Sequence, residues 1–245
     1  MTSTKDKLID VAEKFYRGNH KLLKSVDDFD YSYERNEALQ WCFVSPFPSI
    51  FLHEAVSTRD MKRMDLCRFL INDLSRVIHQ PMDQKSNRQF YRGLKVNEAG
   101  LENLTKNTGK LICARGYFTC FKSRKTALDL ARSTIYRADL RPVLFKINCP
   151  PSVPLAEIPT ASLAGLVVFD LYMTFRIKSV NSDMVTVVTL ESASEDGKQY
   201  ARAYRTKNRS MNLLDALDQL VIVPKPIPPL PLIKKLPKGE TKKEK

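Results

Sequence analysis

The stretch FYRGLKV, residues 90–96, has the composition of a short β-strand with an arginine and a glycine in its middle. Both residues weaken the interior of a strand. The simplest interpretation is an edge strand whose arginine is solvated. The alternative is that the guanidinium of Arg92 faces a cleft, where its planar set of donors suits a phosphate or a ribose, and that Gly93 lets a ligand approach the backbone. The surrounding sequence decides between these two interpretations.

The composition indicates an intracellular globular protein. Of the 245 residues, 43% are hydrophobic, which excludes wholesale disorder. The N-terminal residues mix charges as no signal peptide does, and no apolar run reaches membrane-spanning length. We therefore expect a cytoplasmic protein without a membrane segment. Five cysteines without a C-x-x-C spacing indicate reduced thiols and no metal site: Cys42, Cys67, Cys113, Cys120 and Cys149.

The chain is strongly basic, with a formal net charge of +13 and a pI of about 9.5. Such a charge attracts polyanions weakly at long range. The sequence contains neither an RNA-binding aromatic signature nor zinc-finger spacing. A dedicated nucleic-acid-binding fold is therefore disfavoured.

Three regions follow from the hydrophobic pattern. Residues 1–88 are predicted to be helical and packed on the core. Within them a helix begins after the N-cap Asp60, keeps one apolar stripe through Ile78 and stops by Pro81. His53 and His79 lie on separate helical segments and are expected to be packing or surface residues. The single tryptophan, Trp41, is expected to pack between helices.

Residues 89–223 are predicted to form the core. Strands are expected in QFYRGLKV, LICARGYFTCF and PVLFKINCP, and in successive antiparallel segments of GLVVFDLYMTFRIKSVNSDMVTVVTLESA. Helices are expected in NEAGLENLTKNTGK and SRKTALDLARSTI, and a further helical segment after residue 195. Residues 224–245 are rich in proline and lysine and are predicted to be a disordered tail. Its stretch Lys225–Pro231 has the K-x-x-P-x-x-P form that suits a protein partner's polyproline-binding groove, although a solvated tail is the simpler interpretation.

The order of these pieces resembles the arginine-specific mono-ADP-ribosyltransferases, from about Glu34 to Ala203. The pieces are YRG, RGYFTCFKSRKTALDLA, VLFKI, AEI, VVF, TFRIKSV and VTVVTLE. The resemblance implies an α+β protein with the ADP-ribosyltransferase fold: two small, mostly antiparallel sheets form an NAD cleft, beside a helical N-terminal half. It also implies NAD as the substrate or bound ligand.

The resemblance implies roles for particular residues. Arg92 takes the place of the family's NAD-gripping arginine, between Tyr91 and Gly93. The family's Ser-Thr-Ser run, which orients the ribose and shapes the nicotinamide pocket, is here Thr119-Cys120-Phe121, so that only its first residue keeps a hydroxyl. Cys120 is expected to be a packed thiol, and Arg176 in TFRI a structural residue.

The family's Glu-x-Glu, which precedes a strand like Val167-Val168-Phe169, is absent. Its position is Ala164-Gly165-Leu166. The missing carboxylates would stabilise the oxocarbenium-like transition state and deprotonate the acceptor arginine. A positioned anion of this kind is worth a factor on the order of 10²–10³ in rate. The nearest possible substitutes are Glu157, in a loop, and Asp170, three residues beyond Val167, where the strand begins.

Three interpretations remain open on this sequence. The first is an ADP-ribosyltransferase-fold protein with a degraded active site and a retained NAD cleft. The second is an active enzyme with altered chemistry, such as NAD hydrolysis, that uses Glu157 or another carboxylate. The third is a non-enzymatic interaction module that recruits partners through its basic, proline-rich tail.

Overall fold

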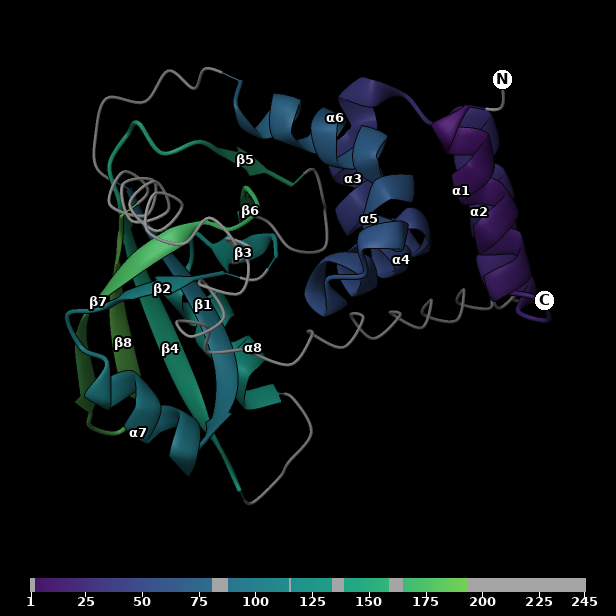
Figure 1. The fold of residues 1–245 in the computed structure, drawn as a ribbon. Helices are drawn as coiled ribbons and strands as arrows, with labels where there is room; N and C mark the ends of the chain where they lie inside the picture. The colour runs from purple at the N-terminus through teal and green to yellow at the C-terminus, as the bar shows by residue number, and fades with distance from the viewer. Residues whose placement is uncertain (1–2, 81–87, 115, 134–138, 159–164, 194–245) are drawn as a thin grey trace, which may run out of the picture.

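The computed structural model describes residues 3–80, 88–114, 116–133, 139–158 and 165–193 (Figure 1). The predicted helical segment after residue 195, the tail and Lys225–Pro231 lie outside the described residues. The helices before the first strand are α1 (Thr4–Phe15), α2 (His20–Ser32), the 3-10 helix η1 (Arg35–Glu37), α3 (Ala38–Phe43), α4 (Pro46–Thr58), α5 (Met61–Leu66) and α6 (Arg68–Ile78). Within the described residues, no helix is long and apolar enough to cross a membrane.

Local sequence signals set several of these helix ends. Asp60 is the N-cap of α5, because its side chain accepts hydrogen bonds from the backbone N–H groups of Lys62 and Arg63. The helix expected to continue from there is interrupted at Cys67, and α6 then extends to Ile78. The apolar stripe continues across the interruption because Cys67, Leu70, Leu74 and Ile78 are all buried.

The second half of the chain forms one hydrogen-bonded sheet. Its strands are β1 (Arg88–Asn97), β2 (Leu111–Cys113), β3 (Phe118–Phe121), β4 (Leu140–Cys149), β5 (Leu155–Glu157), β6 (Leu166–Phe169), β7 (Thr174–Ser182) and β8 (Thr186–Ser192), with helices α7 (Glu98–Lys106) and α8 (Arg124–Ser133) between them. The strand order is β2-β7-β8-β4-β1-β3-β6-β5. Strands β4 and β8 are parallel, and the other neighbours are antiparallel.

This sheet has two parts that meet at one residue pair. Strands β1 and β4 pair over ten residues, whereas β1 and β3 pair only at Tyr91 and Phe121. One part is therefore β2-β7-β8-β4-β1 and the other is β3-β6-β5. The α+β class is confirmed, and the two expected sheets are two parts of one continuous sheet.

The two sheet parts pack against each other through aromatic side chains. The ring of Phe175 on β7 lies 5.2 Å from that of Phe118 on β3 and 5.9 Å from that of Phe169 on β6, measured between centroids. Phe90 on β1 lies 5.7 Å from Phe169. These residues belong to one apolar core between the two parts. We call the surface of β3-β6-β5 that faces this core the inner face, and its opposite surface the outer face.

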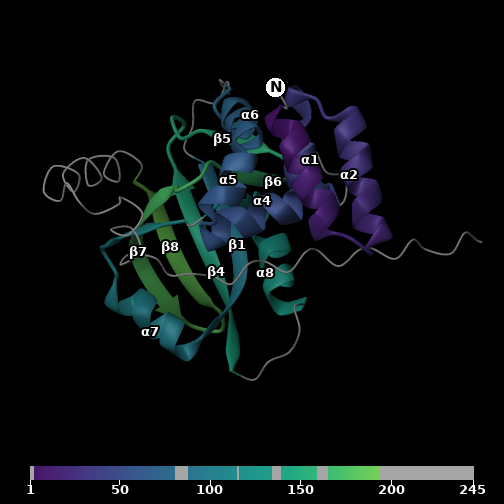
Figure 2. The same cartoon turned by 45° about the vertical axis from the view of Figure 1, so that its right-hand side comes forward.

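The N-terminal helices gather on one side of the sheet, beside β5 and β6 (Figures 1 and 2). They share a second apolar core with outer-face residues of the three-stranded part, including Phe121, Leu166 and Val168. Polar contacts join the same two regions: the Ser75 hydroxyl donates to Asp170 at 2.8 Å, and Nε2 of His79 lies 2.9 Å from the same oxygen. The outer face of β3 and β6 is therefore covered by helices.

Gly93 is required by helix packing. A Cβ atom built at this position would lie 1.8 Å from the carbonyl oxygen of Ala127 on α8. No side chain can be accommodated at that distance without moving the backbone of the helix. The space beside Gly93 is thus filled by α8, which answers the question of why a glycine interrupts this strand.

Candidate functional site

Arg92 lies in the interior of the sheet. Strand β1 has β4 on one side and β3 on the other, and the Arg92 side chain is only 8% exposed. The interpretation of FYRGLKV as an edge strand with a solvated arginine is therefore wrong. An arginine in a central strand needs partners for its donors, and these determine what the site can do.

The guanidinium of Arg92 bonds where β1 and β3 separate. Its Nη1 donates to the backbone carbonyl of Thr119 at 3.0 Å and to the Thr119 hydroxyl oxygen at 3.3 Å. Its Cζ lies 4.6 Å from the centroid of the Phe118 ring, a cation–π distance. The structure thus brings together Arg92 and Thr119, two residues that the sequence predicts for NAD binding.

The charge of Arg92 has no anionic partner within the described part of the chain. Burial lowers the pKa of its guanidinium, yet an arginine stays protonated at neutral pH. The Nε atom is buried and has no hydrogen-bond partner among the described residues. Burying a cation without an anionic partner lowers the free energy of unfolding by roughly several kcal/mol. An anionic ligand that reached this group would lower that cost.

His53 of α4 lies near Arg92, which the sequence did not predict. The pKa of His53 is lowered to about 4, mainly by burial and to a smaller extent by the positive charge of Arg92, while a hydrogen bond with the Cys42 backbone acts in the opposite direction. His53 is therefore neutral at pH 7, so that it adds no second positive charge beside Arg92. Its ring packs near Phe43 and Tyr117, with centroids 5.2 and 6.3 Å away. The one signal in the sequence, a histidine on an apolar helix, is too common to indicate such a position.

The rest of the predicted ribose and nicotinamide pocket is apolar and closed. Phe121 and Leu166 face each other directly across β3 and β6 and are only 5% and 9% exposed. Tyr91, which pairs with Phe121, is half-buried against the same core. Cys120 is fully buried, and burial raises the pKa of its thiol, so it is packed and unreactive.

The Glu-x-Glu position contains no carboxylate. Ala164 lies outside the described residues, Gly165 adopts a left-handed φ of +77°, and Leu166 begins β6. Leu166 belongs to the helix-covered core, so an apolar side chain stands where the resemblance predicts a glutamate.

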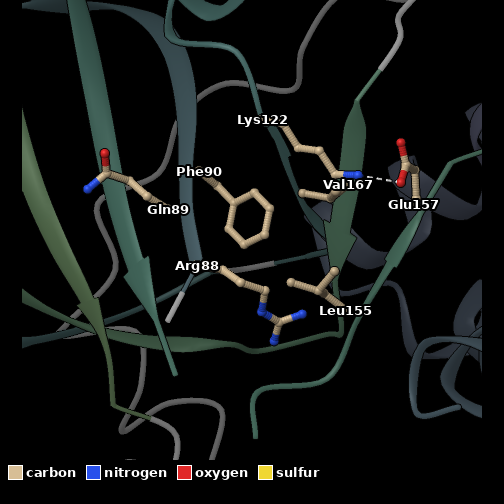
Figure 3. Close-up of a pocket in the computed structure, with 7 residues that line it drawn as sticks. All are labelled: Arg88, Gln89, Phe90, Lys122, Leu155, Glu157 and Val167. Atoms are coloured by element: carbon tan, nitrogen blue, oxygen red, sulfur yellow. Dashed lines mark hydrogen bonds and ion pairs between the residues drawn. The ribbon is translucent and has the colours of Figure 1, made fainter. Parts of the chain in front are cut away.

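Glu157 lies on the wrong face to replace the missing glutamate. It pairs with Val167 on β6, so its side chain lies on the inner face, opposite to that of Leu166. It forms an ion pair with Lys122 at 2.5 Å (Figure 3). The same two residues border a cavity of about 230 Å³ that Arg92 does not line.

Asp170 is held by the helical region. Besides Ser75 and His79, it accepts a hydrogen bond from the backbone N–H of Leu171 at 2.8 Å. It follows Leu166 by four residues, which is about 13 Å along an extended strand. Its oxygens therefore serve to join α6 to the end of β6.

The five cysteines form no disulfide with one another. All five cysteine side chains are buried and unpaired. Arg176 donates to the carbonyl of Gly109 at 2.7 Å, in keeping with the structural role expected for it. Trp41 packs against Phe29, with ring centroids 5.4 Å apart.

No protein-family model matches the chain, and no curated protein matches it. Solved structures of ADP-ribosyltransferases are similar to it in chain path. Exoenzyme S from Pseudomonas aeruginosa, solved with human 14-3-3 protein beta and carba-NAD, is 16% identical over 88% of this chain and 98% of its own, with a TM-score of 0.48.

The C3 exoenzyme of Clostridium limosum is 12% identical over 76% of this chain and 94% of its own, with a TM-score of 0.49. The Vis toxin, an ADP-ribosyltransferase from Vibrio splendidus, is 16% identical over 78% of this chain and 84% of its own, with a TM-score of 0.44. Similarities at this level carry no argument about activity. The functional proposal therefore rests on the chain's own residues.

Proposed function

We propose that the chain is an ADP-ribosyltransferase-like protein that binds NAD through Arg92 and has lost efficient ADP-ribose transfer to arginine. The observation that carries this proposal is the state of Arg92. It is a buried cation without an anionic partner in the described part of the chain, at the junction of the two sheet parts. A phosphate of NAD would supply the missing charge and accept from the free Nε.

The loss of catalysis follows from the residues around this arginine. Transfer of ADP-ribose develops positive charge on the ribose, and a positioned carboxylate in a dry site is worth a factor on the order of 10²–10³ in rate. Leu166 and Phe121 occupy the face where that carboxylate and a hydroxyl would lie. We infer that NAD is held at its phosphates while its nicotinamide-side ribose lacks the groups that activate it.

An enzyme with altered chemistry is the second candidate, and two observations weigh against it. Glu157 points away from the Leu166 face and is already paired with Lys122. Asp170 is held by three hydrogen-bond partners. Neither carboxylate can reach the ribose site without breaking these contacts.

The third candidate is an interaction module that binds no NAD and recruits partners through its tail. A protein partner at Lys225–Pro231 and weak attraction of polyanions remain proposals based on the sequence. So does a cytoplasmic location, which the five buried, unpaired cysteines support.

Incubation with labelled NAD and poly-arginine tests the proposed loss of activity. We expect labelling no higher than in a sample without the protein, and NAD recovered intact. Strong protein-dependent labelling would overturn the loss of transfer, and release of nicotinamide without labelling would favour the altered enzyme. Failure to bind NAD would favour the interaction module.

A further inference from the structure

A cavity of about 230 Å³ opens on the inner face of the three-stranded sheet part (Figure 3). Its floor is apolar and consists of Phe90 on β1, Leu155 on β5 and Val167 on β6. Its rim carries Arg88, Lys122 and Glu157. Because Val167 and Leu166 are adjacent strand residues, they face opposite sides, and the cavity is separate from the surface on which NAD would react.

We propose that this cavity binds a small aromatic carboxylate whose ring lies on the apolar floor and whose carboxylate pairs with Lys122. The size fits one or two fused rings, because an apolar cavity of about 150 Å³ suffices for benzene. An apolar floor with a few polar groups at its rim is the usual make-up of small-molecule sites.

Lys122 is the more accessible of the two rim cations, because it is exposed whereas Arg88 is partly buried. Nη2 of Arg88 donates to the carbonyls of Pro150, Pro151 and Val153 and is thus occupied in holding the β4–β5 connection. Within the described residues Lys122 makes one ion pair, with Glu157, and an ammonium group has three donors. Its side chain is also half exposed, which leaves room for a second carboxylate.

Glu157 has the opposite effect on such a ligand. Its carboxylate lies 2.5 Å from Nζ of Lys122, on the same rim as the incoming charge. Two carboxylates that share one ammonium group repel each other. Removing the charge of Glu157 should therefore strengthen binding, whereas removing the charge of Lys122 should weaken it. Nonspecific attraction to a basic protein would give the same signs, so shifts of the cavity's own signals are needed to identify the site.

Titration with 2-naphthoate, followed by methyl NMR of the full chain, tests the proposal. We expect the methyl signals of Leu155 and Val167 to shift and those of Val26, in the helical core, to stay in place. The neutral amide 2-naphthamide should bind at least about tenfold more weakly, since a charged hydrogen bond is lost. NAD should not displace 2-naphthoate, because Arg92 does not line this cavity.

Two variants complete the test. Lys122→Gln should weaken 2-naphthoate binding at least about tenfold, and Glu157→Gln should tighten it a few-fold. Both side chains are about half exposed, so both variants should fold. The proposal fails if the Leu155 and Val167 methyl signals do not move, if the amide binds equally well, or if Lys122→Gln has no effect. Displacement by NAD would instead assign the ligand to the Arg92 site and would also overturn it.

Discussion

Replacement of Leu166 by glutamate returns a carboxylate to the start of β6 and tests whether this face is closed. Leu166 is 9% exposed and lies opposite Phe121 within the core shared with the helices. Burial in such surroundings raises the pKa of a glutamate, by about three units as an order of magnitude, from about 4.3. One pKa unit corresponds to about 1.36 kcal/mol, so the ionised glutamate should lower the free energy of unfolding by about 4 kcal/mol.

The pH dependence of this cost has a definite sign. A carboxyl group whose folded-state pKa is raised binds more protons in the folded state than in the unfolded state between the two pKa values. The destabilisation is therefore absent below the unfolded pKa of about 4.3, grows as the pH rises, and is complete above about pH 8. Leu166→Gln is the matched control, since it loses the leucine and gains a polar group but cannot ionise.

Urea unfolding of the two variants at pH 5 and pH 8 measures the difference. We expect the glutamate variant to be about 4 kcal/mol less stable than the glutamine variant at pH 8, but only about 1 kcal/mol less stable at pH 5. Equal stability at both pH values would show that position 166 faces water. The surface around Leu166 and Phe121 would then be an open cleft, and our explanation for the lost catalysis would be refuted.

Three further predictions concern the fold. Gly93→Ala should lower the free energy of unfolding by at least about 3 kcal/mol, because the new Cβ would lie 1.8 Å from the Ala127 carbonyl oxygen. An unchanged melting temperature would contradict this prediction. Asp170→Asn should lower the free energy of unfolding in urea by about 1–3 kcal/mol, because it weakens the hydrogen bonds with Ser75 and His79. A stability equal to that of the wild type would show that these contacts are dispensable. Alkylation of the denatured protein without reductant should modify all five cysteines, and a protected pair in the mass spectrum would disprove the reduced state.

The sequence predicted the elements better than their arrangement. The apolar stripe and the Asp60 cap were sufficient for the helices around residues 61–78, because both signals are local. LICARGYFTCF was expected as one strand but forms two, β2 and β3, which belong to different parts of the sheet. Most residues of that stretch suit a strand, although Gly116 weakens it, and only long-range pairing decides to which part of the sheet each half belongs.

The candidate site shows the same limit. The resemblance implied one NAD site for Arg92 and Thr119, but not the hydrogen bond that joins them in the structure. The sequence left Glu157 open as a substitute, and only the register of β5 against β6 places it on the opposite face. The proximity of His53 to Arg92 depends on how α4 packs on the sheet, which no local signal records.

Equilibrium binding of NAD to the wild type and to Arg92→Lys, measured by calorimetry, tests the central claim most directly. The exposed Arg141→Lys is the matched control, and melting temperatures identify any variant that has lost its fold. Lysine keeps the charge but loses the planar donors, so we expect binding to weaken at least about tenfold in Arg92→Lys and to be unchanged in Arg141→Lys. Absence of NAD binding by the wild type, or equal affinity in a folded Arg92→Lys variant, would contradict the account.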